Sequence, residues 1–129
     1  MALILVVDDD AAVRDSIRTV LELDGHAVVE AADGRQGEAQ IARGAPDLVV
    51  LDIFMPERDG FETLRSLRRT HPRLKILAIS GSAGGQLERT LAFAREFGAD
   101  AALHKPFPAD ALRAQVRALL KPDAAQANG

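Results

Sequence analysis

Residues 3–10 read LILVVDDD, a run of five large apolar residues that ends abruptly at three consecutive aspartates. A continuous run of Val, Ile and Leu is typical of a parallel strand that is covered on both faces, not of an alternating, half-solvated strand. Three neighbouring carboxylates repel one another and tend to raise each other's pKa. The fold predicted from the rest of the chain must therefore explain why acids stand where a buried strand ends.

Apolar patterns alternate between strands and helices along the remaining chain. Four more segments have strand patterns: HAVVEA (26–31), DLVVLD (47–52), KILAIS (75–80) and AALH (101–104). Helical stripes fill the gaps between the strands. The members of these stripes are Val13, Ile17, Val20 and Leu21; Phe61, Leu64 and Leu67; Leu87, Leu91 and Ala94; and Leu112, Val116, Leu119 and Leu120. The segment after Gly34 has Ile41 as its one large apolar residue, so its helix is the least marked of the five.

Residues at the helix ends support this division. Asp10 is placed to cap a helix that begins at Ala11. Gly25 and Gly98 are placed to end helices, and Pro122 cannot continue the last one. Five successive β–α units predict an α/β fold, a doubly wound five-stranded parallel sheet with five helices. We expect residues 1–121 to form one domain and residues 122–129 to be a disordered tail.

Residues able to do chemistry stand where the predicted strands end. Asp8 and Asp9 follow the first strand, Asp52 ends the third, Ser80 ends the fourth and Lys105 follows the fifth. In open parallel sheets, ligands bind beyond the carboxyl ends of the strands. A hard divalent cation at this edge would offset the repulsion between the acids, and Mg²⁺ prefers a few carboxylates together with water and phosphate oxygens.

This set of residues fits phosphoryl transfer to a carboxylate. Asp52 could form an acyl phosphate once its charge is neutralised and a donor is positioned. Mg²⁺ held by Asp9 and Asp52 would neutralise one side, and the Lys105 ammonium another. Ser80 would donate a hydrogen bond to a phosphoryl oxygen, and the backbone amide of Gly81 could approach closely because glycine has no side chain.

The residues around Lys105 indicate how it is aimed. Pro106 fixes its own φ, so the Lys105-Pro106 pair predicts a rigid turn that could direct the ammonium inward. His104 is expected on the opposite side of the strand from Lys105, and we regard it as non-catalytic.

Composition excludes several classes of protein. The chain has 129 residues, no Cys and a formal net charge of −3, from 16 basic and 19 acidic residues. A disulfide framework and a zinc-thiolate site are therefore excluded, and the mild acidity argues against nucleic-acid binding. The basic cluster RSLRRTHPRLK (65–75) is interpreted as a solvated helix end. No apolar run approaches the roughly 20 residues that span a bilayer, so we expect a soluble, cytoplasmic protein that does not bind membranes.

Four motifs together resemble the receiver domain of bacterial two-component response regulators. They are ILVVDDD (4–10), DLVVLDIFMPERDG (47–60), AISG (78–81) and GADAALHKPF (98–107). The resemblance implies a flavodoxin-like fold with strand order 2-1-3-4-5. It also implies a phosphoprotein that is not an enzyme, although it promotes its own phosphorylation and dephosphorylation. We expect a stand-alone receiver that takes its phosphoryl group from a histidine kinase or a histidine phosphotransfer protein and signals to an unknown downstream protein.

The same resemblance implies individual roles at the site. Asp52 would be the phosphoacceptor. Asp9 would bind Mg²⁺ (or Mn²⁺) directly and Asp8 partly through water, with the main-chain carbonyl of Phe54 as a further ligand.

Three more roles follow from the resemblance. Ser80 would be the switch hydroxyl and Lys105 the phosphate-binding lysine, whose bond to Pro106 is usually cis in this family. Met55-Pro56 and Gly60 match the loop after the acceptor.

Two departures from the family pattern concern the switch. Ala102 stands where many members have the Tyr or Phe that swings inward on activation, so an aromatic switch is impossible at this position. Gly81 replaces the more usual alanine, and the segment 81–85 is rich in glycine, which predicts a permissive loop. Phe93 and Phe97 are candidates for the output surface, although packing in the core is the favoured interpretation.

Three other functions remain open from the sequence. An aspartyl-phosphate phosphohydrolase that depends on Mg²⁺ would need a second acid two residues after the nucleophile, where this chain has Phe54. In a flavin-binding module, the aspartates at 8–10 would repel the phosphate of the flavin. A receiver-like fold without phosphorylation is expected to lose pocket residues, and this chain retains the central five.

Overall fold

The structure, a computed structural model, describes residues 2–53, 60–81, 92, 94–96 and 98–121. Five strands alternate with helices, and each bound lies within one residue of the segment predicted for its strand. The strands are β1 (Leu3–Val7), β2 (Ala27–Ala31), β3 (Leu48–Asp52), β4 (Lys75–Ser80) and β5 (Ala101–His104). The helices with described bounds are α1 (Ala11–Leu23), α2 (Gly34–Arg43), α3 (Gly60–Thr70) and α5 (Ala109–Leu120). Residues 92 and 94–96, between β4 and β5, are also helical.

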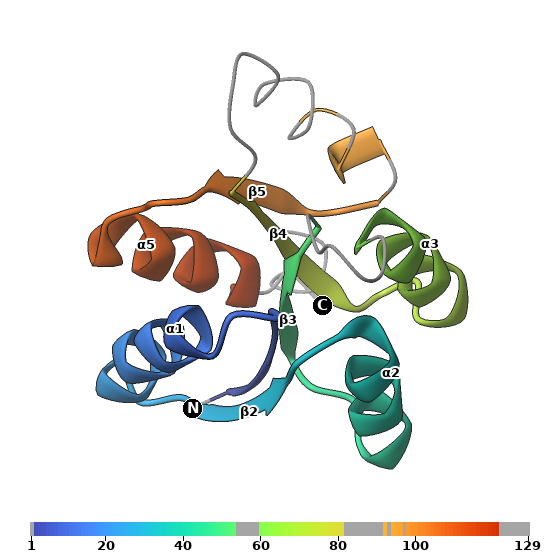
Figure 1. Cartoon of the computed structure of the whole chain (residues 1–129), viewed down its shortest axis with the longest axis horizontal. Coiled ribbons are helices and arrows are strands. Elements are labelled where there is room, and N and C mark those ends of the chain that lie inside the picture. Colours follow the sequence, from blue (N-terminus) through green and yellow to red (C-terminus); the bar gives the residue numbers. More distant parts are fainter. Residues whose placement is uncertain (1, 54–59, 82–91, 93, 97, 122–129) are drawn as a thin grey trace.

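The strands form one parallel sheet in the order β2-β1-β3-β4-β5. Helices α1 and α5 lie on one face of this sheet, and α2 and α3 lie on the other (Figure 1). The expected doubly wound parallel fold, with strand order 2-1-3-4-5, is confirmed. Because all strands are parallel, their carboxyl ends meet at one edge of the sheet.

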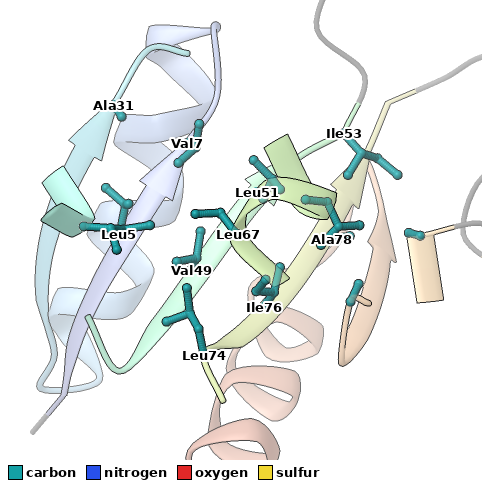
Figure 2. Close-up of a cluster of buried hydrophobic side chains, with 14 residues drawn as sticks. Leu5, Val7, Ala31, Val49, Leu51, Ile53, Leu67, Leu74, Ile76 and Ala78 are labelled. Carbon is teal, nitrogen blue, oxygen red and sulfur yellow. The ribbon is translucent and has the colours of Figure 1, made fainter. Parts of the chain in front are cut away.

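Two hydrophobic cores lie on opposite sides of the sheet. Leu5 and Val7 of β1 belong to the core beneath α2 and α3, which is drawn in Figure 2. Ile4 and Val6 of the same strand belong to the core beneath α1 and α5. Successive side chains of a strand point to opposite faces, so a strand covered on both faces must be apolar throughout. The continuous apolar runs of the sequence have this cause.

Helix ends follow the predicted signals. The Asp10 side chain accepts hydrogen bonds from the backbone N–H groups of Ala12 and Val13, which confirms it as the N-cap of α1. Gly25, just beyond the end of α1, has a φ of 90°, a conformation that glycine adopts without a steric penalty. The expectations for Leu87, Leu91, Pro122, the tail and the Phe61 side chain lie outside the described residues.

Candidate functional site

The carboxyl edge of the sheet brings the predicted site residues together. Asp8 directly follows β1, Asp52 ends β3, Ser80 ends β4 and Lys105 directly follows β5. These strands are neighbours in the order β1-β3-β4-β5. The side chains of Asp8, Asp52 and Ser80 are buried, so the site is set into the end of the sheet.

Lys105 links the two buried carboxylates. Its Nζ donates to Asp8 Oδ2 at 2.7 Å and to Asp52 Oδ2 at 3.1 Å. The Lys105 side chain is 19% exposed, while those of Asp8 and Asp52 are 0% and 3% exposed. The ammonium therefore pairs with carboxylates that water scarcely reaches, and it offsets part of their charge.

Opposing effects act on the pKa of Lys105. Burial disfavours the charged ammonium and lowers this pKa. Hydrogen bonds to Asp8 and Asp52 and the negative charges of both carboxylates raise this pKa, and together these four effects outweigh that of burial. The net result is a raised pKa, so Lys105 stays protonated throughout the physiological range.

Three carboxylates at this edge have the spacing of a metal site. One oxygen each from Asp8, Asp9 and Asp52 lies within 4.8 Å of the other two. Asp9 is exposed, and among the described residues its carboxylate makes no hydrogen bond. One ammonium cannot balance three carboxylates, and all three donors are the hard oxygen atoms that Mg²⁺ prefers. The donor set therefore fits a hard divalent cation.

The turn after β5 holds Lys105 in place. The Lys105-Pro106 bond is cis, as expected, and the Lys105 backbone N–H donates to the Ser80 carbonyl at 2.8 Å. A Cβ added to Gly81 would lie 3.4 Å from Lys105 Cδ, so this position lies against the lysine stem. His104 pairs in register with Ser80 and makes no hydrogen bond to the carboxylates of Asp8 or Asp52.

Other predicted residues occupy nearby positions. Ala102 packs, partly buried, against the core beneath α2 and α3. At Gly60, an added Cβ would lie 2.3 Å from Ile53 Cα, so α3 begins in direct contact with the backbone just after β3. The expected roles of Phe54, Met55-Pro56, Phe93 and Phe97 lie outside the described residues.

An apolar groove opens beside Lys105. It has a volume of about 700 Å³ and lies between α1, α5 and the turn after β5. Its lining consists of Ala12, Val13, Ser16, Ile17, Val20, Gly81, Lys105, Pro106, Phe107, Ala109 and Leu112. The sequence indicated the apolar stripes of both helices but did not indicate that a groove between them would reach the site.

Arg14 and Glu30 are site neighbours that sequence reasoning missed. Arg14 Nη1 donates to the main-chain carbonyl of Asp8 at 2.6 Å, and its Nε donates to Glu30 Oε1 at 3.0 Å. Arg14 and Asp8 are six residues apart, which is not one of the helical spacings at which neighbours meet. The pairing of Arg14 with a residue of β2 depends on strand order and has no local signal.

The fold and this site define a class: α/β domains with a parallel sheet whose carboxyl edge holds an acidic pocket bridged by one lysine. The family model for the response regulator receiver domain matches residues 4–117. The chain belongs to this family. It is the receiver domain of a response regulator in a two-component system, and the phosphohydrolase alternative is not favoured.

Similar proteins include curated relatives and solved receiver domains. The chain is 46% identical over 118 residues to the response regulator MprA of Mycolicibacterium vanbaalenii, an alignment that covers 92% of this chain and 50% of that protein. The chain thus spans about half the length of the curated relatives it matches.

Two solved structures illustrate the likeness of fold. The receiver domain of NtrX from Brucella abortus is 37% identical with a TM-score of 0.84, over 91% of this chain and 97% of that one. A CheY-like receiver domain protein from Methanospirillum hungatei is 32% identical with a TM-score of 0.86, over 100% of this chain and 99% of that one. In the described part of the chain, no helix is both long enough and apolar enough to cross a membrane.

Proposed function

We propose that Asp52 accepts a phosphoryl group from the phosphohistidine of a histidine kinase or a phosphotransfer protein, with Mg²⁺ (or Mn²⁺) bound by Asp8, Asp9 and Asp52. Residues 1–121 act as the receiver domain and signal through protein contacts. The observation that carries this proposal is the contact of one half-buried ammonium with the buried carboxylates of Asp8 and Asp52, next to a third carboxylate within reach of a shared cation.

The bound cation would neutralise negative charge on the carboxylates and on the incoming phosphoryl oxygens. An Asp52 carboxylate oxygen attacks phosphorus; a P–O bond forms as the P–N bond to the donor histidine breaks, and the electron pair of that bond stays on the histidine nitrogen. Lys105 already lies 3.1 Å from Asp52 Oδ2, so its ammonium would pair with a phosphoryl oxygen of the product. The Ser80 hydroxyl and the Gly81 amide supply further donors.

The groove between α1 and α5 supports a protein donor over a small-molecule substrate. Its lining is mostly apolar and includes Lys105 and Gly81 of the site itself. A helix of the donor protein seated there would bring its phosphohistidine to the carboxyl edge of the sheet. Because such a donor is phosphorylated at the expense of cytoplasmic ATP, we place the domain in the cytoplasm.

Phosphorylation by a small phosphodonor tests the acceptor directly. Incubation with acetyl phosphate and Mg²⁺ is expected to add the mass of one phosphoryl group, in a form that hydroxylamine removes. Asp52→Asn is expected to abolish the adduct. Asp47→Asn is the matched control, because Asp47 is an exposed residue just before the opposite end of β3. An undiminished adduct in Asp52→Asn would contradict the proposal.

Profiling of phosphotransfer against the histidine kinases of the source organism then tests the partner. The donor is identified as the kinase that phosphorylates the wild type much faster than the other kinases do. If no kinase or phosphotransfer protein labels Asp52, although acetyl phosphate does, the proposed donor class is wrong and the acceptor chemistry stands.

A further inference from the structure

Asp8 is held by hydrogen bonds on its backbone as well as on its side chain. Its N–H donates to the Ala31 carbonyl of β2 at 3.1 Å. Its carbonyl accepts from Arg14 Nη1 at 2.6 Å. Its carboxylate accepts from the Asp10 N–H at 2.9 Å and from Lys105. The turn that carries Asp9 is therefore anchored at the residues on both sides of it.

Glu30 in turn holds Arg14. Glu30 Oε1 accepts from Arg14 Nε at 3.0 Å, and Glu30 Oε2 pairs with Arg18. The side chains of Arg14 and Glu30 are 17% and 26% exposed, so both are largely withdrawn from water. The planar guanidinium of Arg14 can donate in two directions at once in a fixed geometry, and here it links β2 to the Asp8 carbonyl.

The charge of Glu30 also has a consequence for cation binding. A guanidinium near three carboxylates would by itself weaken their binding of a divalent cation, because its positive charge offsets part of their negative charge. The ion pair with Glu30 counteracts that effect, and it leaves the N–H groups of Arg14 available to the Asp8 carbonyl. The arrangement thus combines a rigid anchor with little added positive charge.

We propose that Arg14, oriented by Glu30, is a positioning residue that holds the turn of Asp8 and Asp9 in the geometry required for divalent-cation binding. This inference rests on the proposed function, because it assigns a role toward the cation of that same site. Groups that orient metal ligands typically contribute about 10- to 100-fold to metal affinity.

Arg18 provides a matched control for Arg14. Both arginines lie on α1 and pair with Glu30, but Arg18 also donates to the Val28 carbonyl at 2.8 Å and to Glu22 Oε2 at 3.4 Å, and it makes no hydrogen bond to Asp8. Arg14→Met and Arg18→Met each keep an unbranched stem and helix propensity while removing one ion pair with Glu30. The two variants separate a role at the site from general attachment of α1 to β2.

The experiment measures Mn²⁺ affinity by the electron paramagnetic resonance signal of the free ion, in the unphosphorylated protein. We expect Arg14→Met to raise the dissociation constant on the order of 10-fold and Arg18→Met to change it less than twofold. A second measurement needs no metal: amide hydrogen exchange at Asp10, whose N–H donates to Asp8, is expected to speed up in Arg14→Met and not in Arg18→Met.

Three results would overturn the inference. They are an unchanged dissociation constant in Arg14→Met, an equal loss of affinity in both variants, or unchanged exchange at Asp10. Failure of the wild type to bind Mn²⁺ would instead overturn the metal site of the proposed function, and the inference with it. A third pattern separates the two ideas: the wild type binds Mn²⁺, Asp9→Asn abolishes this binding, and Arg14→Met binds as tightly as the wild type. That pattern would leave the proposed function intact and remove only the role of Arg14.

Discussion

Lys105 balances charge at the carboxyl edge of the sheet. Its ammonium contacts two carboxylates whose side chains are almost completely withdrawn from water. Breaking such a pair leaves charges that neither solvent nor protein compensates, which typically costs about 3–5 kcal/mol. At the scale of single residues, stability and cation binding are therefore linked through this one lysine.

Lys105→Met is expected to lower the free energy of unfolding by about 3 kcal/mol in the absence of Mg²⁺. Added Mg²⁺ should then stabilise the variant more than the wild type, because the cation meets carboxylates that no ammonium offsets. Urea unfolding with and without Mg²⁺ measures both effects. Lys121→Met, at an exposed position just after α5, is the control, and an equal Mg²⁺ effect in Lys105→Met and wild type would contradict the prediction.

The pH dependence of this pair follows from the raised pKa of Lys105. Lys105 has a higher pKa in the folded protein than in the unfolded chain, where the pKa is about 10.5. Such a group contributes stability that is fully present below the unfolded pKa and is lost as the pH rises through the folded pKa. The difference in stability between the wild type and Lys105→Met is therefore expected to be constant near neutral pH and to shrink in alkaline solution. A difference that shrinks in acid alone would be inconsistent with this origin.

Small residues decide how closely α2 approaches both the sheet and α3. In α2, a Cβ added to Gly37 would lie 3.0 Å from Val7 Cγ2, and one added to Gly34 would lie 2.1 Å from Thr63 Oγ1. The buried residues of α2 are Gly34, Gly37 and Ile41. At the scale of elements, α2 packs through glycines, which explains why its apolar stripe is so weak in the sequence.

The start of α3 is more constrained still, and Gly60→Ala tests it. The added Cβ would lie 2.3 Å from Ile53 Cα and 2.5 Å from the Asp52 carbonyl oxygen, both backbone atoms that cannot turn aside. We expect a loss of about 3 kcal/mol in the free energy of unfolding.

Gly44→Ala is the control for that substitution. An added Cβ meets nothing within 4 Å there, and its φ of 174° is extended backbone that any residue adopts. A change within about 0.5 kcal/mol is expected. Chemical denaturation of both variants measures the difference, and equal losses would show that the close approach at Gly60 has no energetic effect.

An ion pair ties distant parts of the chain together at the C-terminal end of α1. Asp24, the C-cap of α1, accepts hydrogen bonds from Arg117 of α5 through both of its carboxylate oxygens. Its Oδ2 lies 3.0 Å from Arg117 Nε. The hydrogen bond from Arg117 is the largest influence on Asp24 and holds the pKa of its carboxyl below 3.8. At the scale of the whole molecule, this pair joins helices that the sequence separates by more than 80 residues.

Asp24→Asn is expected to be less stable than the wild type at neutral pH. Since the folded pKa of Asp24 is lowered, its contribution is present above about 3.8 and is lost as the pH falls through the folded value. Thermal unfolding of both proteins between pH 7 and pH 2 should show the two midpoints converging in acid. Asp110→Asn is the control, because the Asp110 side chain is 89% exposed and an exposed pair contributes little.

Much of this protein was determined by the sequence alone. Continuous apolar runs separated by helical stripes imply a parallel sheet covered on both faces. In such a sheet the carboxyl ends of the strands lie together, so Asp8, Asp9, Asp52, Ser80 and Lys105 had to meet at one edge. These conclusions depend on periodicity and on residue type at strand ends, which are local properties of the chain.

The tertiary structure alone decided which groups touch. That Lys105 contacts Asp8 and Asp52 together, that Glu30 orients Arg14, and that a groove between α1 and α5 reaches the site all depend on strand order and helix placement. No local pattern contains these distances, because each partner comes from a different βα unit. They exist only once the two cores have packed and brought those units together.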